Sequence, residues 1–491
     1  MQARTVLERA LKGSGVVSLV ATLQFVVAFV AQMALARILA PEVFGQFAFV
    51  LLVLGLVTSC RSIQAGEFLV YRKDDRKEAY FTVFTIDLIL SVITTAVVAM
   101  AAGPIMAVAG RPELAPALRL AILSCLILPL GVTGAVFHRE VDFVRTGICQ
   151  VAGILTGPVL KVVLALHGFG IYSLIIGELA RQGLEMSIMW FMAPLRPRFA
   201  LDYRLLREAM AFSLPITLSS LLVYYYWKVD DFIVGRFLGM EQLGFYWLAF
   251  RIPEYLFTLR FHFVPIVFAS FARLETTEHR HQAFALLTKL TMLVVFPAAL
   301  VSMVFGDDLI GLVFGSRWLP AAPAFKLLML TCALRVATSY SGDLFKVSGR
   351  TWIFPIISGV NAVLLTIGVY TFTLWLGITG TALGVLTMIT LSLVFTEWIL
   401  WRWFSLSLCR LMLGPVAALT AATVVGTLAY RCMPPGELAA RLASTLSGGA
   451  APWAHAPRML RVLGDRLPGL DRLVRLCERR DRQQMNTEVP R

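Results

Sequence analysis

Charged residues are scarce in this chain of 491 residues. Asp, Glu, Lys and Arg make up 15% of the sequence, whereas a soluble globular domain carries roughly 25%. Hydrophobic residues account for 58%. Water is therefore excluded as the main solvent of this chain, and the composition predicts a membrane protein.

Cysteine pairs with the spacing of a metal site are also missing. The seven cysteines are scattered along the chain, and most lie within apolar runs: Cys60, Cys125, Cys149, Cys332, Cys409, Cys432 and Cys477. A zinc site or a disulfide framework needs close, paired spacings. We therefore expect no metal and no cofactor, and interpret the cysteines as small packing residues.

Long apolar runs dominate the first 430 positions. A membrane-spanning helix needs about 20 such residues, and continuous runs in lipid predict helices rather than a barrel. The first run follows a basic N-terminus but is too long for a cleavable signal peptide. We predict spans at 14–36, 44–66, 80–101, 117–137, 147–167, 170–192, 209–234, 244–268, 286–305, 321–345, 351–375 and 380–402, with another probable span at 409–430.

Lys and Arg gather in alternate connections, starting with the N-terminus, and cytoplasmic loops are the ones that collect them. The N-terminus is therefore predicted to be cytoplasmic, in a bacterial inner membrane. Much of the net charge of +14 belongs to this topology, so we expect membrane lipids rather than nucleic acid as partners. The basic tail 431–491 is either an amphipathic helix on anionic lipid or disordered, and an odd number of spans would place it outside.

The chain contains an internal repeat. Residues 37–47 resemble residues 236–246 at a constant difference of 199, with Arg37, Glu42 and Gly45 matched by Arg236, Glu241 and Gly244. Leu164, Leu166 and Gly170 are matched by Leu374, Leu376 and Gly380 at a difference of 210. Both echoes occur in the same order, which indicates a duplicated unit.

Six helices per unit make the two units parallel. We therefore predict an all-α fold of two six-helix lobes, related by a pseudo-two-fold axis along the membrane normal, with 12–14 transmembrane helices. The predicted boundaries are a cytoplasmic N-terminus 1–13, an N-terminal lobe 14–192, a linker 193–208, a C-terminal lobe 209–402, an additional helix 409–430 and a tail 431–491.

The stretch from Asp230 to Tyr246 resembles the seventh-to-eighth helix signature of polysaccharide transporters. Val264-Pro265, Leu312 to Gly315 with Trp318, and Ser348 to Arg350 are similar to later features of that family. These are the Wzx-type oligosaccharide flippases of the multidrug/oligosaccharidyl-lipid/polysaccharide (MOP) exporter superfamily. The resemblance covers about residues 10–430. It implies two lobes that move undecaprenyl-pyrophosphate-linked sugars to the periplasmic leaflet. It also implies a polymerase and a chain-length regulator as partners.

Charged residues inside the spans are the candidate functional residues, because charge at mid-bilayer is costly and usually faces a cavity or a partner. Lys228, Asp230 and Asp231 lie on the seventh helix, where the first lobe has Phe29, Ala31 and Gln32. Asp230 and Asp231, together with Glu254, are candidate sites for a coupling proton or sodium ion. The alternative is a lysine–aspartate pair near the outer interface that only neutralises itself.

Four arginines are candidates for binding the pyrophosphate, because guanidinium matches phosphate oxygens: Arg61, Arg251, Arg260 and Arg335. Arg251 can also pair with Glu254 three residues on, and Arg61 could instead snorkel to the inner interface. Lys161 and Arg181 are further buried cations. Arg181 is better explained by an intrahelical ladder with Glu178 and Glu185. Arg37 and Arg236 are expected to pair with the following Glu or to cap carbonyl groups.

The function predicted from these observations is flipping of lipid-linked oligosaccharide by alternating access, for exopolysaccharide, capsule or O-antigen synthesis. The alternative is a cation-coupled multidrug antiporter of the same superfamily, which would prefer an acidic, aromatic cavity. A glycosyltransferase or polymerase would need a large outer loop with catalytic carboxylates, and none is present. We therefore expect a transporter, not an enzyme.

Overall fold

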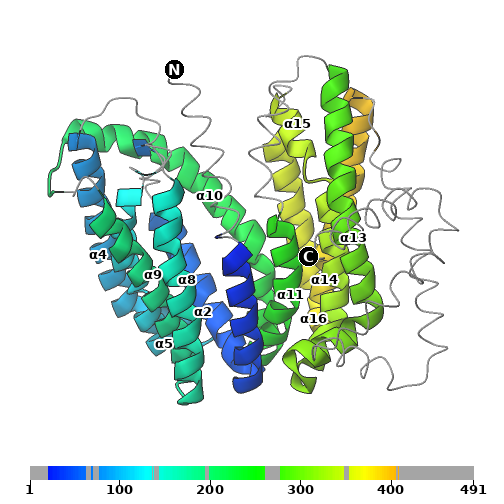
Figure 1. Ribbon diagram of the computed structural model, residues 1–491, viewed down its shortest axis with the longest axis horizontal. Coiled ribbons are helices and arrows are strands. Elements are labelled where there is room, and N and C mark those ends of the chain that lie inside the picture. The colour runs from blue at the N-terminus through cyan, green and yellow to red at the C-terminus, as the bar shows by residue number, and fades with distance from the viewer. Residues whose placement is uncertain are drawn as a thin grey trace, which may run out of the picture. The chain divides into compact units, whose positions relative to one another are not determined.

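The computed structural model consists almost entirely of helices (Figure 1). It describes residues 20, 22–61, 68–69, 77–134, 137, 143–193, 198–259, 277–347, 353–404 and 407. All of these lie in one compact unit, Met1–Ala421. The predicted span 409–430 and tail 431–491 lie outside the described residues.

The N-terminal lobe begins with the apolar helix Thr22–Ile38. The helices that follow are α2 (Pro41–Arg61), α4 (Lys77–Val108), α5 (Ala115–Ala121), α6 (Ser124–Ile127), α8 (Phe143–Leu166) and α9 (Ile171–Met192). The 3-10 turns η1 (Pro112–Leu114) and η2 (Leu128–Thr133) flank α5 and α6. The predicted span 117–137 overlaps the candidate span Pro112–Thr133 but is divided into short helices and 3-10 turns, with Pro129, which has no N–H to donate, at the start of η2.

The C-terminal lobe follows the same order. Its helices are α10 (Tyr203–Phe237), α11 (Met240–Leu259), α13 (Thr277–Phe314), α14 (Ala322–Ala337), α15 (Ser341–Val347) and α16 (Ile353–Phe404), with the turn η4 (Ser316–Ala321) before α14. Helix α16 contains two spans, because Gly377 has non-helical angles inside it. Helix α10 starts six residues before the predicted span, where the carboxylate of Asp202 accepts hydrogen bonds from the backbone N–H groups of Arg204 and Leu205.

Eight helical segments within the described residues are long and apolar enough to cross a membrane. Helices α9 and α11 also coincide with predicted spans, 170–192 and 244–268, and each carries three charged residues. The prediction of an all-α, multi-pass membrane protein is therefore confirmed.

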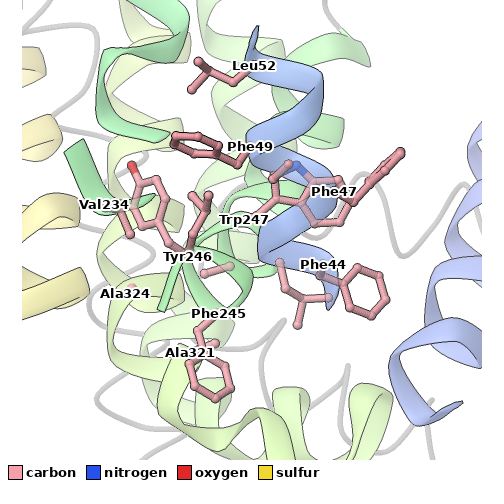
Figure 2. Packing of buried hydrophobic residues seen from close by; sticks show 14 of the residues in the cluster. Phe44, Phe47, Phe49, Leu52, Val234, Phe245, Tyr246, Trp247, Ala321 and Ala324 are labelled. Carbon is pink, nitrogen blue, oxygen red and sulfur yellow. The ribbon is translucent and has the colours of Figure 1, made fainter. Parts of the chain in front are cut away.

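The largest core cluster joins the two lobes through α2 and α11. Figure 2 shows Phe44, Phe47 and Phe49 on α2 facing the aromatic residues Tyr246 and Trp247 of α11. The rings of Phe44 and Trp247 have their centroids 5.9 Å apart. Aromatic packing of this kind adds to the energy of area burial, so the two lobes share one core at this level of the membrane.

Two glycines allow α2 and α11 to approach at their N-terminal ends. A Cβ atom on Gly45 would overlap the carbonyl group of Met240, and one on Gly244 would overlap that of Pro41. Pro41 and Met240, like Gly45 and Gly244, differ by 199 in residue number, so the two contacts exchange under the repeat. The pseudo-two-fold axis therefore passes between the two glycines.

Reciprocal hydrogen bonds surround this contact. The indole N–H of Trp318 donates to the carbonyl of Ala36 at 2.8 Å, and Arg111 donates to the carbonyl of Gly235 at 3.0 Å. Ala36 and Gly235 are again 199 apart. Arg37 donates to the carbonyl of Leu312 at 3.0 Å, which confirms carbonyl capping as its structural role. Each lobe thus caps a helix end of the other.

The second echo of the repeat needs a change of register. Gly170, at φ 52° and ψ −129°, precedes α9, and Gly377, at φ 61° and ψ −143°, has the same conformation inside α16. These glycines differ by 207, so the predicted match of Gly170 with Gly380 is three residues out. Glycine is required at both turns because φ is positive there. The match between the leucines before each turn had set the predicted alignment three residues away from this correspondence.

Candidate functional site

A cavity of about 700 Å³ lies beside the α2–α11 contact. Its walls come from helix Thr22–Ile38, α2, α8 and α9 of the N-terminal lobe and from α11 of the C-terminal lobe. The apolar part of the wall includes several aromatic rings: Phe25, Phe44, Phe47, Trp247 and Tyr255. The charged part consists of Lys161, Glu178, Arg181, Arg251 and Glu254.

Four charged residues on α8 and α9 form one neutral network. The ammonium group of Lys161 donates to Glu178 Oε2 at 2.7 Å, and Arg181 donates from Nη2 to Glu178 Oε1 at 2.6 Å. Arg181 also donates from Nη1 to Glu185 Oε2 at 2.9 Å. The predicted intrahelical ladder of Arg181 is confirmed. Lys161 joins the ladder from the neighbouring helix, and Lys161, Glu178 and Arg181 all line the cavity.

This ionic network lies about midway along α9, which is expected to place it near the middle of the membrane. Arg181 is ten residues from the start of α9, and at about 1.5 Å per residue this places it roughly 15 Å along the helix. The hydrocarbon core is about 30 Å thick. Charges at that depth persist only where partners or a polar cavity compensate for lost hydration, and here both are present.

Arg251 and Glu254 face the same cavity from the C-terminal lobe. Arg251 donates to Glu254 at 2.9 Å, and its guanidinium carbon lies 3.9 Å from the centre of the Trp247 ring. About a quarter of the Arg251 side chain remains exposed. Arg251 can therefore offer guanidinium hydrogens to a ligand in the cavity while Trp247 fixes its plane.

The remaining predicted phosphate ligands do not line this cavity. Arg61 is buried against α4, where it pairs with Asp87 at 3.2 Å and also bonds Ser91. Arg335 on α14 lies 4.0 Å from the ring centre of Trp227 and 4.7 Å from that of Phe257. Within the described residues Arg335 forms no ion pair. Arg260 lies outside the described residues.

The predicted ion-coupling residues occupy two places. Asp230 and Asp231 are buried on α10 in the C-terminal lobe. Asp230 accepts a hydrogen bond from the hydroxyl of Tyr246 at 2.7 Å, and Asp231 pairs with Lys228 at 2.7 Å. Neither aspartate lines the cavity, whereas Glu254 does. The alternative of a lysine–aspartate pair therefore describes Asp231, whereas the described contact of the Asp230 carboxylate is the hydrogen bond from Tyr246 rather than an ion pair.

The structure thus brings together Arg251 and Glu254 and separates Arg61, Arg335, Asp230 and Asp231 from them. Sequence reasoning passed over Glu178 and Lys161 as partners across two helices. No sequence pattern joins these two residues, which are 17 positions apart and meet through the packing of α8 on α9. No group of three or more His, Cys, Asp and Glu residues in the described ranges could hold a metal ion.

Comparisons with known proteins agree with this architecture. The family described as polysaccharide biosynthesis protein matches residues 34–323. The succinoglycan biosynthesis transport protein ExoT of Rhizobium meliloti (strain 1021) is 26% identical over 311 residues, which cover 62% of this chain and 62% of that protein. The lipopolysaccharide biosynthesis protein WzxC of Escherichia coli (strain K12) is 24% identical over 324 residues, covering 64% and 65%. The match therefore spans less than two thirds of either relative.

Solved structures share the fold at low identity. The inward closed conformation of the lipid II flippase MurJ superposes with a TM-score of 0.66 at 12% identity, over 83% of this chain and 92% of that one. An inward-facing multidrug resistance MATE family transporter of the MOP superfamily gives 0.61 at 15% identity, over 79% and 95%. The predicted fold class, including its two parallel lobes, is thereby confirmed.

Proposed function

Because the chain belongs to the family of polysaccharide biosynthesis proteins, we propose that it flips lipid-linked oligosaccharide units across a bacterial cytoplasmic membrane. The observation that carries this proposal is the cavity between α2, α9 and α11, which combines mid-membrane cations with aromatic walls. Cations suit a diphosphate group, and aromatic rings offer apolar surface to sugar faces. The undecaprenyl chain would stay in lipid while the sugar and diphosphate cross.

Transport in this proposal proceeds by alternating access of the two lobes, 14–192 and 209–402, joined by the linker 193–208. In this proposal the α2–α11 contact closes the outer side, and its loss opens the cavity to the periplasm. Arg251 binds the diphosphate in the cavity. Arg61 and Arg335, which lie outside the cavity wall, and Arg260 are proposed as further ligands during transport. Ion binding at Asp230, Asp231 or Glu254 supplies the driving force.

The second candidate is a cation-coupled multidrug antiporter, which the fold shared with a MATE family transporter favours. Such a transporter needs carboxylates free to attract an organic cation. The two carboxylates of the cavity wall are instead paired with cations of the protein: Glu178 with Lys161 and Arg181, and Glu254 with Arg251. This pairing favours an anionic substrate.

A polymerase and a chain-length regulator would then act on the exported units.

Genetic complementation tests the proposed function. We expect deletion of the gene to abolish one surface polysaccharide and to build up its lipid-linked repeat unit on the cytoplasmic face. The wild-type gene restores the polymer, whereas Arg251→Ala does not. Normal polymer in the deletion strain, together with raised sensitivity to cationic drugs, would reject the flippase in favour of the antiporter.

A further inference from the structure

Helices α8 and α9 of the N-terminal lobe correspond to the two halves of α16 in the C-terminal lobe, so the two helix pairs can be compared position by position. The turn glycines Gly170 and Gly377 share one backbone conformation. The next close approach is also repeated: a Cβ on Gly177 would meet Lys161, and a Cβ on Gly384 would meet the backbone of Gly368. Each of these pairs of positions differs by 207, so the helix pairs pack in the same way.

The charges of the ionic network have no counterpart in this second helix pair. At the difference of 207, the four positions Lys161, Glu178, Arg181 and Glu185 become Gly368, Val385, Met388 and Ser392. There the helices are joined by neutral groups, including a hydrogen bond of 3.0 Å from Asn361 to Ser392. The helix packing therefore does not require four charges. Each such charge is costly at mid-bilayer, so the network calls for a reason other than packing.

The geometry of Glu178 shows what the network is suited to bind. Both carboxylate oxygens are used, Oε2 by Lys161 and Oε1 by Arg181, with N–O distances between 2.6 and 2.9 Å. Two oxygens of one phosphate group can take the same two positions, because guanidinium and ammonium groups bind carboxylate and phosphate oxygens alike. Glu178, Lys161 and Arg181 all line the cavity, so a ligand there can reach them.

We propose that Lys161 and Arg181 form an anion-binding site for a phosphate or diphosphate group, which Glu178 occupies in this state and the ligand takes over. The identity of the ligand rests on the proposed function: the diphosphate is the headgroup of the lipid-linked substrate. A diphosphate competes with Glu178 because it carries more negative charge and can also contact Arg251 in the same cavity. Glu178 thereby keeps two mid-membrane cations neutral when the cavity holds no substrate.

Binding of inorganic pyrophosphate and of farnesyl diphosphate to the purified full-length protein in lipid nanodiscs tests this site. We expect Glu178→Gln to bind both probes at least tenfold more tightly than wild type, because the amide no longer competes for the cations. Adding Lys161→Met to Glu178→Gln should remove the gain while keeping the site's net charge at its wild-type value. The matched control is Asp307→Asn, which frees Lys326 outside the cavity and should leave both affinities unchanged.

Equal or weaker pyrophosphate binding by a Glu178→Gln protein that keeps the wild-type melting temperature would overturn the proposal. An equal gain for Asp307→Asn would overturn it as well, since the effect would then be one of net charge alone. Tighter binding of farnesyl diphosphate than of pyrophosphate assigns the site to a lipid headgroup, and equal binding assigns it to a free anion.

The two proposals fail separately in these experiments. If deletion of the gene abolishes the polymer but Glu178→Gln does not strengthen binding, the flippase stands and the site does not. If the deletion strain makes normal polymer while Glu178→Gln binds pyrophosphate more tightly, the site stands and the substrate is another phosphate compound.

Discussion

Replacing Gly45 by alanine should push the lobes apart at their outer contact. The added Cβ would overlap the Met240 carbonyl and lie 2.9 Å from the backbone nitrogen of Gly244. These are backbone atoms, which cannot rotate away as a side chain would. Overpacking costs about 1–3 kcal/mol in well-packed cores, and we expect the upper part of that range here.

This penalty applies only to the state in which α2 and α11 touch. A difference of about 2–3 kcal/mol changes the ratio of two states roughly 30- to 150-fold, since each 1.4 kcal/mol is a factor of ten. Gly45→Ala should therefore raise the population in which the outer ends are separated by that factor. Gly244→Ala should act in the same direction, because it overlaps Pro41 across the same axis.

The assay is labelling of a single cysteine at Ala36, which is 2% exposed, by a membrane-impermeant maleimide in whole cells. The native cysteines are first replaced by serine. We expect Gly45→Ala to raise the labelling rate by more than tenfold. A second reporter cysteine at Ala102, which is fully buried on α4, should not change, and this separates opening from unfolding.

The matched control is Gly103→Ala, because a Cβ at Gly103 meets nothing within 4 Å. Labelling of the Ala36 reporter should stay within twofold of wild type in this variant. If Gly45→Ala labels no faster than Gly103→Ala, the glycine contact does not hold the lobes together and the reasoning from the overlap is refuted.

Three further predictions follow from the contacts of single side chains. Arg61→Met alone should lower the thermal unfolding midpoint in detergent more than Arg61→Met combined with Asp87→Leu. Breaking a buried ion pair costs about 3–5 kcal/mol, whereas replacing both partners can be neutral. Equal losses in the two variants would contradict this. Trp318→Phe removes the hydrogen bond to Ala36, worth about 0.5–1.5 kcal/mol, and should raise labelling of that reporter severalfold; unchanged labelling would argue against the cap. Arg335→Ala should red-shift the fluorescence of Trp227 and destabilise the protein by about 0.5–2 kcal/mol, and wild-type emission would argue against stacking.

The helical fold was accessible to sequence reasoning because lipid imposes long, continuous apolar runs. The same runs conceal where a helix breaks. The predicted span 117–137 is divided into short helices and 3-10 turns, whereas the break at Gly377 inside α16 falls between the predicted spans 351–375 and 380–402. Repetition of Arg37, Glu42 and Gly45 located the lobes, but the reason for it is contact across the axis, which no single copy reveals.

The candidate site was only partly predictable because a charge in a span does not say which neighbour it faces. Arg251 and Glu254 were singled out and do line the cavity. Arg61 and Arg335 looked alike in the sequence, yet one lies in an ion pair and the other on aromatic rings. Lys161 and Glu178 are 17 residues apart, and only the packing of α8 on α9 joins them.

The glycine pair on the pseudo-two-fold axis also bears on how such a chain could arise. Contacts that exchange with one another, as Gly45 with Met240 and Gly244 with Pro41 do, are isologous, the type formed by symmetric dimers. A six-helix ancestor could therefore have paired with itself through this surface before its gene was duplicated and fused. Fusion then freed each half to change alone, so one half could acquire the Lys161–Glu178 network and the other the Asp230–Asp231 pair while the shared axis stayed unaltered.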